Sequence, residues 1–364
     1  MTPKTEQELA DAIASAKGPL HITGGGTRPI GNPVVGEGLS TSGLSGITLY
    51  EPGALTIVAQ AGTPVAEIEA ALDSENQRLA FEPMDHRALL GTSGAPTIGG
   101  VVAGNVSGSR RIAVGACRDH ALGVRFVDGA GEITKNGGRV MKNVTGYDLV
   151  KLMCGSFGTL GVLSEVSLKV LPKPETSATL TLHGLSVAQS VEAMSAALGS
   201  PFEVTGAART HDTHIRIEGF AASVAYRLEK LKDLLSGYGE ISVTEDANLW
   251  AGITNVTGFA KTDSDIWRVS IKPSDAPALI AALPDTCETS LDWGGGLIWV
   301  ATPAGTDLRA TMAVDGHATL VRASTQTRAA LPVFHPENPT VTALSQGLRA
   351  KFDPRGILNA GLMG

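Results

Sequence analysis

The residue pattern best suited to chemistry lies near the start of the chain, in the segment GGGTR at residues 24–28, which follows a strand-like run at 20–23. Consecutive glycines expose backbone N–H groups that no Cβ covers, so such a segment can approach a pyrophosphate closely. It lacks the GxGxxG spacing of a nicotinamide fingerprint and the Gly-Lys-Ser/Thr ending of a P-loop. Taken alone, the pattern is also typical of a plain glycine turn between two strands.

A second segment, residues 91–123, interleaves glycine with alanine, serine and asparagine. These small residues leave space for a large, flat ligand. Asn105 and Ser107 are candidates for side-chain hydrogen bonds to it. Arg110 or Arg111 is a candidate for the positive charge that a phosphate group needs.

A third segment, residues 140–174, contains a glycine turn, GSFGTLG, that leads into a strand. The Pro172-Lys173-Pro174 break at its end predicts a domain boundary, with one domain over 1–172 and another over 173–364. Of the 44 glycines, 27 lie in residues 1–172. A function that depends on glycine is therefore expected in the first domain.

Other reactive side chains do not form recognisable sites. Cys117, Cys154 and Cys287 have no CxxC spacing, so reduced thiols are expected rather than a disulfide framework, a zinc site or an iron–sulfur site. His211 and His214 are three residues apart in an expected strand, where they would face opposite sides. A metal site is therefore not predicted.

The composition is that of a globular protein without a nucleic-acid partner. A chain of 364 residues is long enough for roughly two domains, and 43% hydrophobic residues can build their cores. The net charge of −7 comes without a basic cluster, and only 16 residues are Phe, Trp or Tyr, so nucleic-acid binding is not expected. No apolar run is long enough for a membrane span, so a cytoplasmic protein is expected, with any membrane contact peripheral.

The elements that must position these segments follow an α+β order. The first half predicts helices over 5–17, from Thr63-Pro64 to about 72, and over 148–153, with strands over 20–23, 47–52, 54–62 and 162–174. The second half predicts helices over 221–235 and just before 352, with strands over 266–273 and 297–303. A second domain with an antiparallel sheet and helices on one side fits this order.

In this order, the three glycine-rich segments resemble the FAD-binding domain of the vanillyl-alcohol oxidase type flavoproteins, the PCMH-type domain, which implies two α+β subdomains. The stretches that carry the resemblance are ITGGGTRPIG, PTIGGVVAGNVSGSRRIAVGACRDHALG and VMKNVTGYDLVKLMCGSFGTLGVLSEVSLKVLPKP. Within that group the chain looks most like the FAD-binding subunits of bacterial glycolate oxidases. The resemblance covers the first 174 residues and is thin beyond them, except at FDPRGILNAG (352–361). That segment is similar to the closing motif of related 2-hydroxyacid dehydrogenases and is expected to return towards the flavin.

The resemblance assigns cofactor contacts residue by residue. It implies phosphate and ribose contacts for the first two glycine segments and backbone contacts to the flavin or adenine part for Val162. The implied cofactor-binding residues are Gly24, Gly25, Gly26, Thr27, Arg28, Thr97, Gly99, Gly100, Asn105, Ser107, Gly108, Gly115 and Val162. Members with covalently attached FAD use a His or Cys at a glycine loop. Because the first loop offers Thr27 and Arg28 there, non-covalent FAD is expected.

Two departures from the catalytic members of the family leave the catalytic residues unassigned. Relatives of the D-lactate dehydrogenase type have SEGTLG where this chain has Phe157 in place of the carboxylate. They also carry an HGHxGDGN-like motif in the second domain, whereas the nearest glycine-rich turn here, 292–296, contains no histidine. Neither the base that takes the proton of a 2-hydroxy acid nor a metal that orients its carboxylate is therefore predicted.

Four side chains near these segments have two open interpretations. His86 and His120 are either structural histidines or groups at the edge of the flavin. Trp293 and Trp299 flank the turn at 292–296 and either pack in a core or interface or stack on the flavin.

The resemblance implies an FAD-carrying subunit of a glycolate oxidase-like complex that oxidises glycolate or D-lactate to the 2-oxo acid. A homologous catalytic flavoprotein subunit would act on the substrate, and an iron–sulfur subunit would pass the electrons on. Such a complex would be cytoplasmic, or peripheral on the inner membrane through its partners. A self-sufficient FAD-dependent 2-hydroxyacid dehydrogenase and a non-catalytic flavin-binding scaffold are the alternatives.

Overall fold

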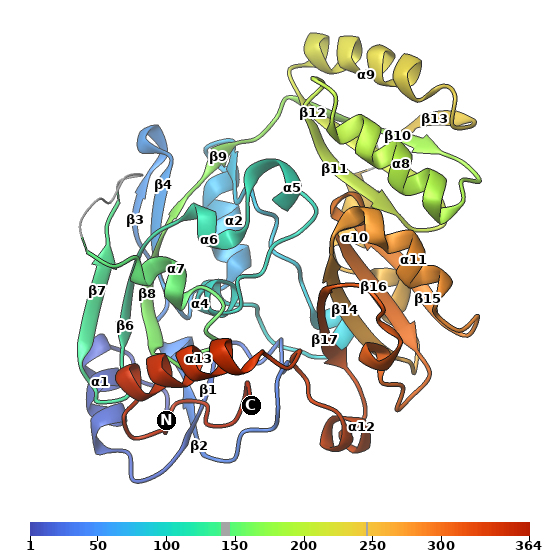
Figure 1. Cartoon of the computed structure of the whole chain (residues 1–364). Helices are drawn as coiled ribbons and strands as arrows, with labels where there is room; N and C mark the ends of the chain where they lie inside the picture. The colour runs from blue at the N-terminus through green and yellow to red at the C-terminus, as the bar shows by residue number, and fades with distance from the viewer. Residues whose placement is uncertain (140–145, 245–246) are drawn as a thin grey trace.

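The computed structural model describes residues 1–139, 146–244 and 247–364, so the start of the third glycine-rich segment, 140–145, lies outside the described residues. The chain forms two α+β halves side by side, each built around an antiparallel sheet (Figure 1). The predicted fold class is confirmed.

The chain begins with a helix and a pair of parallel strands. Helix α1 (Glu6–Ser15) starts after Thr5, whose hydroxyl accepts a hydrogen bond from the Glu8 N–H at 3.1 Å. It is about two residues shorter than predicted. Strand β1 (Leu20–Thr23) pairs in parallel with β2 (Glu37–Ser40) and leads directly into the first glycine segment.

A five-stranded antiparallel sheet forms the centre of the first half. Its order is β3 (Ile47–Glu51), β4 (Thr56–Gln60), β8 (Val162–Lys169), β6 (Ala121–Val127) and β7 (Ile133–Gly137). Helix α4 (Ile98–Ala103) packs against β8, and helix α2 (Val65–Asp73) buries Val65, Ile68 and Leu72 in the same core. The spacing of these three residues is the helical one that the sequence predicts.

Short elements connect the longer ones in this half. They are β5 (Gln77–Arg78), which pairs with β9 (Leu171–Pro172), and the helices α3 (Arg87–Leu90), α5 (Arg111–Val114), α6 (Cys117–His120) and α7 (Leu149–Met153). After β9 the chain enters the sheet of the second half at Thr176.

The second half contains an eight-stranded antiparallel sheet. Its order is β13 (Ile241–Thr244), β10 (Thr176–Leu182), β12 (Thr213–Gly219), β11 (Val204–Arg209), β15 (Glu288–Asp292), β16 (Leu297–Thr302), β14 (Asp265–Ile271) and β17 (Gly316–Arg322). Helices α8 (Val187–Leu198), α9 (Ala221–Leu235) and α11 (Ala276–Ala281) share one buried apolar cluster with this sheet, and Figure 1 shows them on one side of it. The predicted antiparallel sheet is confirmed.

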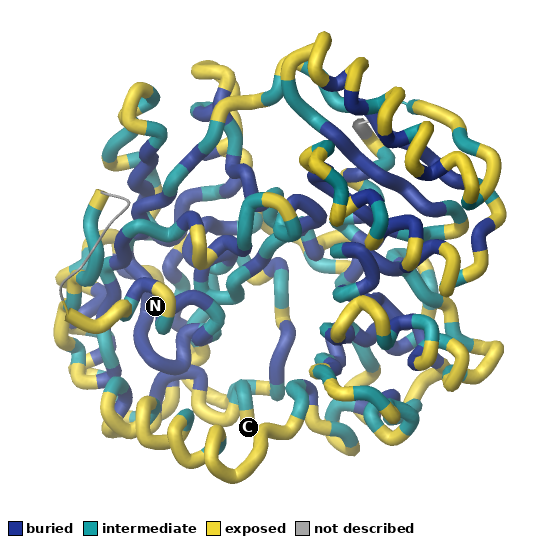
Figure 2. The backbone as a smooth tube through the Cα atoms, turned by 45° about the horizontal axis from the view of Figure 1, so that its top comes forward, coloured by how far each residue is buried: buried dark blue, intermediate teal, exposed yellow. Residues whose placement is uncertain are grey.

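The other face of this sheet contributes to the core of the first half. Ile266, Leu297 and Trp299 belong to the same buried cluster as Ile98 and Phe126. Figure 2 shows buried segments towards the inside of each half and exposed segments on the outside. Trp299 is only 5% exposed and therefore packs in an interface, the first of its two interpretations. Helix α10 (Ala247–Thr254) packs against Ala208 of β11 through Trp250 and Ile253.

Ion pairs with little solvent exposure join the two halves. Glu218 on β12 pairs with Arg78 at 2.7 Å and with Arg110. Arg216, two residues earlier on the same strand, pairs with Glu82 at 2.9 Å. Because these charges are mostly removed from water, each needs its partner to stay ionised at acceptable cost.

The chain ends by returning to the first half. After α12 (Thr325–Ala330) and α13 (Pro339–Phe352), Leu358 forms a parallel bridge with Leu20 of β1. Helix α13 lies on the surface and buries no residue. Among the described residues, no helix combines the length and apolar character that crossing a bilayer requires.

Candidate functional site

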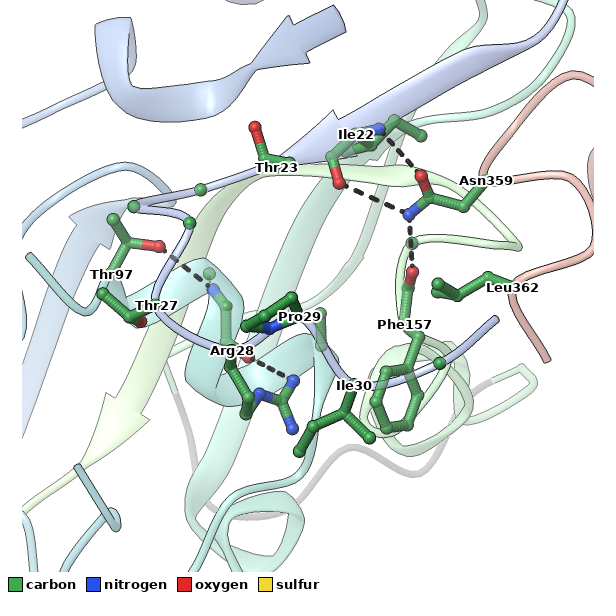
Figure 3. Close-up of a pocket in the computed structure, with 18 of the residues that line it drawn as sticks. Ile22, Thr23, Thr27, Arg28, Pro29, Ile30, Thr97, Phe157, Asn359 and Leu362 are labelled. Atoms are coloured by element: carbon green, nitrogen blue, oxygen red, sulfur yellow. Dashed lines mark hydrogen bonds between the residues drawn. The ribbon is translucent and has the colours of Figure 1, made fainter. Parts of the chain in front are cut away.

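A cavity of about 530 Å³ lies where the glycine segments meet the C-terminal segment (Figure 3). Its volume is in the range of small-molecule and cofactor sites. Nine of the thirteen predicted cofactor residues line it: Gly24, Gly25, Gly26, Thr27, Arg28, Thr97, Gly99, Gly100 and Val162. The fold therefore brings the first loop, the start of α4 and the start of β8 to one space.

The other four predicted residues lie outside the lining of this cavity and hold the loop that follows α4. The Asn105 and Ser107 side chains accept hydrogen bonds from backbone N–H groups at the start of α6, at 3.0 and 2.9 Å. The Gly108 carbonyl accepts one from the Trp293 indole at 3.0 Å. Gly115 follows α5 with a φ of +88°, which favours glycine.

The first glycine loop forms a backbone cradle along the cavity. A Cβ on Gly25 would stand 1.7 Å from the Ala95 carbonyl oxygen, so only glycine permits this close approach. Gly26 has a φ of +67°. The N–H groups of Gly25, Gly26 and Thr27 donate no hydrogen bond to any other residue that the structure describes. Free adjacent N–H groups of this kind fit the oxygens of a pyrophosphate.

At the start of α4 the helix backbone is exposed to the cavity. The Thr97 hydroxyl accepts a hydrogen bond from the Gly100 N–H at 3.3 Å and caps the helix. A Cβ on Gly100 would meet only that hydroxyl oxygen, at 3.2 Å, so its hydrogen faces open space. A ligand can therefore lie directly against the helix backbone at Gly100.

Arg28 and Phe157 mark the other end of the cavity. The Arg28 guanidinium donates to the Gly100 carbonyl oxygen at 3.2 Å and lies 5.0 Å from the centre of the Phe157 ring. Burial lowers the pKa of Arg28 to about 10, and the group stays cationic at neutral pH. Phe157 also meets Phe334 edge to face at 5.1 Å. This end is thus aromatic and positively charged.

His86 lines the cavity, whereas His120 does not. The Nδ1 of His86 lies 3.2 Å from the Met84 carbonyl oxygen. Since a carbonyl only accepts, Nδ1 must carry the proton and Nε2 the lone pair. Burial, and then the charge of Arg28, lower the pKa of His86 to about 3, so the ring is neutral. His120 is bound to the Val114 carbonyl oxygen at 3.0 Å and is structural.

Asn359 is a site residue that the sequence did not single out, although it lies in the predicted closing motif. Its side-chain oxygen accepts from the Ile22 N–H at 2.7 Å, and its amide donates to the Phe157 carbonyl oxygen at 2.9 Å (Figure 3). Its φ is +45°, a region that asparagine tolerates better than most residues. The sequence feature that could have identified Asn359 is its place directly before Ala-Gly in the closing motif.

The remaining candidates have structural partners. Arg110, one of two proposed phosphate charges, is paired with Glu218 instead, and Arg111 lies against the Trp293 ring, 4.6 Å from its centre. His211 lies in the turn before β12, so the expectation that it shares a strand with His214 is wrong. Asp212 completes the turn there, and His214 on β12 bonds to Thr181 and Thr210.

Comparison with known proteins shows to which family the chain belongs. Residues 1–137 match a family model described as "FAD binding domain". The whole chain is similar to "Glycolate oxidase subunit GlcE" of Escherichia coli (strain K12), with 35% identity over 361 residues, 98% of this chain and 95% of that protein. The chain belongs to the GlcE family. The predicted resemblance and the assignment to the FAD-dependent oxidoreductases are confirmed.

A further relative is similar to half of this GlcE-family chain, and a solved structure resembles nearly all of its fold. "Glycolate oxidase subunit GlcD" of Bacillus subtilis (strain 168) is 33% identical over 186 residues, 50% of this chain and 38% of that protein. A solved structure of "alkyldihydroxyacetonephosphate synthase" superposes with a TM-score of 0.70 over 99% of this chain and 76% of that chain, at 15% identity. The latter likeness extends the fold relationship over both halves and says nothing of activity.

Proposed function

We propose that this chain is the FAD-carrying subunit of a glycolate oxidase complex that oxidises glycolate, and D-lactate as a second substrate, to the 2-oxo acid. The single observation that carries the proposal is similarity to GlcE over 98% of the chain. The glycine-lined cavity supports it, because its free N–H groups and its volume suit a dinucleotide.

In this proposal the residues of the cavity form two sets, and four residues outside its lining form a third. The N–H groups of Gly25, Gly26 and Thr27 hold the pyrophosphate, and Arg28, Phe157 and Val162 border the isoalloxazine. Asn105, Ser107, Gly108 and Gly115 act by holding the neighbouring loop. When bound, FAD supplies a two-electron acceptor. The chain binds it, orients it and excludes water from it.

Non-covalent attachment follows from the residues of the first loop. Thr27 and Arg28 provide no nucleophile of the His or Cys type. Precipitation of the flavin-loaded chain with acid should therefore release all the yellow colour into the supernatant. Flavin that stays with the denatured protein would contradict non-covalent attachment.

The proposed complex includes a catalytic flavoprotein subunit and an iron–sulfur subunit that carries the electrons onward. Any membrane contact is peripheral and made through these partners, which leaves this chain on the cytoplasmic side. His86 lines the proposed flavin cavity, but a pKa of about 3 makes it a weak proton acceptor. This favours substrate oxidation by the complex over oxidation by this chain alone.

Dye reduction with glycolate tests the proposal. The purified chain and its complex with both partner subunits are compared at equal FAD content. We expect glycolate-dependent turnover from the complex and at least about 100-fold less from the chain alone, since a positioned base contributes roughly 10²–10⁴. Robust turnover by the isolated chain would instead favour the self-sufficient dehydrogenase. Full turnover by a complex whose copy of this chain lacks FAD would indicate a scaffold.

A further inference from the structure

A serine, a histidine and an aspartate form a chain of hydrogen bonds at one end of the eight-stranded sheet. The Oγ of Ser242 lies 2.8 Å from Nε2 of His183, and Nδ1 of the same ring lies 2.9 Å from Oδ2 of Asp212. The first contact spans 59 positions of sequence and the second spans 29, so the fold brings the three side chains together. Their order is that of a nucleophile, a general base and the carboxylate that orients the base.

The register of three neighbouring strands places these side chains on one face. Strand β13 pairs with β10, which pairs with β12 (Figure 1). Ser242 lies opposite Thr181, two residues before His183. His183 directly follows β10 and Asp212 directly precedes β12, so they extend the antiparallel register by one pair. Since Leu182 beside His183 belongs to the apolar cluster under the helices, the three polar side chains project from the opposite face.

The carboxylate determines which nitrogen of His183 carries the proton. Oδ1 of Asp212 accepts a hydrogen bond from the Gly184 N–H at 3.3 Å, and Oδ2 faces the ring. Burial alone would raise the pKa of Asp212, but the hydrogen bonds from His183 and Gly184 bring it below its ordinary value. An ionised carboxylate only accepts, so Nδ1 is protonated and the neutral ring presents the lone pair of Nε2 to the Ser242 hydroxyl.

This site is open to a small ligand. Ser242 is exposed, and 39% of the His183 side chain and 23% of the Asp212 side chain are accessible. Strand β13 is the edge of the sheet, and its Glu240 carbonyl accepts from the His183 N–H at 3.0 Å. Because hydrogen-bonded and non-bonded pairs alternate from there, the Val243 N–H points to the free edge, away from β10. This N–H directly follows the nucleophile and is available to the oxygen of a carbonyl that Ser242 attacks.

We propose that Ser242, His183 and Asp212, here called the serine triad, form an acyl-transfer site for small esters with a good leaving group. Ser242 and His183 are the catalytic residues, and Asp212 is a positioning residue. A single backbone donor gives limited stabilisation of an oxyanion, which restricts the site to activated esters. The inference goes beyond the proposed function and does not depend on it.

The reaction needs only the ester and water. As Oγ of Ser242 bonds to the carbonyl carbon, Nε2 of His183 takes the hydroxyl proton. The ester C–O bond then breaks, and the departing oxygen receives that proton. Water attacks the acyl-serine with His183 again taking and returning a proton, which releases the acid and restores the hydroxyl.

Reaction of the purified full-length chain with p-nitrophenyl acetate tests the inference. We expect a burst of nitrophenolate and, by mass spectrometry of the digested chain, an acetyl group on Ser242. Ser242→Ala should abolish the burst. His183→Gln should slow acetylation of Ser242 by about 100-fold or more, since it removes the general base.

Two variants of Asp212 separate positioning from a purely structural role. Asp212→Asn should slow acetylation of Ser242 at least about tenfold, because an amide no longer selects the productive tautomer of His183. Asp212→Glu retains a carboxylate and should restore part of the rate. Far-UV circular dichroism shows whether each variant folds. If an Asp212 variant does not fold, Ser242→Ala and His183→Gln decide.

Ser236→Ala and His211→Gln are the matched controls. Ser236 is an exposed serine after α9 whose hydroxyl donates to the Asp233 carbonyl oxygen at 2.9 Å. His211 is an exposed histidine directly before Asp212, so its variant tests for hydrolysis by any surface imidazole. Neither substitution should change the burst or the acetylation of Ser242 by more than about twofold.

The inference is wrong if Ser242 of the wild-type chain is not acetylated. It is equally wrong if folded His183→Gln acetylates Ser242 at the wild-type rate, or if Ser242→Ala keeps the burst. None of these outcomes affects the proposed function, which is judged by FAD content and by glycolate oxidation in the complex. A chain that acetylates Ser242 but never holds FAD would contradict the proposed function and leave the serine triad in place.

Discussion

The side-chain amide of Asn359 donates a hydrogen bond to the carbonyl oxygen of Phe157 at 2.9 Å, across 202 positions of sequence. Its oxygen simultaneously accepts from the Ile22 N–H. One side chain thus fixes the last loop of the chain to the first strand and to the turn before β8. The cavity has a closed wall at this end because residues from three distant segments meet on Asn359.

Replacing Asn359 should loosen this wall. In Asn359→Ala the Ile22 N–H and the Phe157 carbonyl lose their partner in a place where Asn359 itself is only 4% exposed. We expect the free energy of unfolding to fall by about 1–3 kcal/mol and FAD to dissociate faster. Urea denaturation and flavin release on dilution measure both.

Gln7→Ala is the control for this variant. Gln7 donates its side-chain amide to the Asp11 carboxylate at 2.9 Å on the exposed surface of α1, and it lies outside the lining of the cavity. Its loss should change the stability by less than about 1 kcal/mol and leave the rate of flavin release unchanged. Equal effects of the two substitutions would show that Asn359 has no special role at the cavity.

Gly100→Val tests whether the ligand lies against the backbone of α4 at Gly100. The branched side chain would project into the cavity, since a Cβ there meets only the Thr97 hydroxyl. We expect flavin affinity to fall at least about tenfold while the far-UV circular dichroism spectrum is retained, because the new atoms occupy ligand space rather than core.

Gly53→Val is the matched control, since Gly53 is exposed and a Cβ there meets nothing within 4 Å. Its flavin content should equal that of the wild-type chain. Normal occupancy in Gly100→Val would remove α4 from the proposed cofactor site.

The parts of the fold that the sequence predicts well are those determined by local pattern. Helix α9 runs over the predicted residues 221–235 because Val224, Leu231 and Leu235 recur at helical spacing and are buried. The helices predicted to begin near residues 5 and 148 likewise form, and the side chains of Thr5 and Asp148 cap them, since a cap depends on atoms only three residues away.

Features that depend on distant contacts could not be read from the sequence. The pairing of β1 with β2 has no periodic signal, because EGLS at 37–40 shows no alternation of polar and apolar residues. Motif matching also cannot separate residues that border the cavity, such as Gly100, from residues such as Ser107 that hold a loop behind it. The ion pairs of Glu218 with Arg78 and Arg110 form only when the two halves are docked.

The ion pairs between the halves should contribute strongly to stability. Glu218→Gln would leave the guanidinium of Arg110, 7% exposed, without its carboxylate. A buried charge that loses its partner typically costs about 3–5 kcal/mol. We expect the midpoint of urea unfolding, followed by tryptophan fluorescence, to fall accordingly.

Glu229→Gln serves as the reference substitution of the same kind. Glu229 pairs with Lys232 on the exposed surface of α9, with 67% and 37% of the two side chains accessible. Its loss should change stability by less than about 1 kcal/mol. A Glu218→Gln variant as stable as Glu229→Gln would mean that water reaches the junction between the halves.

Neutral, buried His86 should make the fold sensitive to acid. Its pKa is about 3 in the folded chain and 6.5 without burial, so between these values the unfolded chain binds the extra proton. Stability therefore falls as the pH drops through 6.5. His86→Gln removes this contribution, and between pH 7 and 5.5 the wild-type chain should lose about 1 kcal/mol more than the variant. Asp292, with a pKa of about 6, contributes in the opposite sense but equally in both proteins, so it cancels from the difference. If the free energy of unfolding of the wild-type chain and of His86→Gln, measured in urea, changed in parallel with pH, His86 would be protonated in the folded chain over this range.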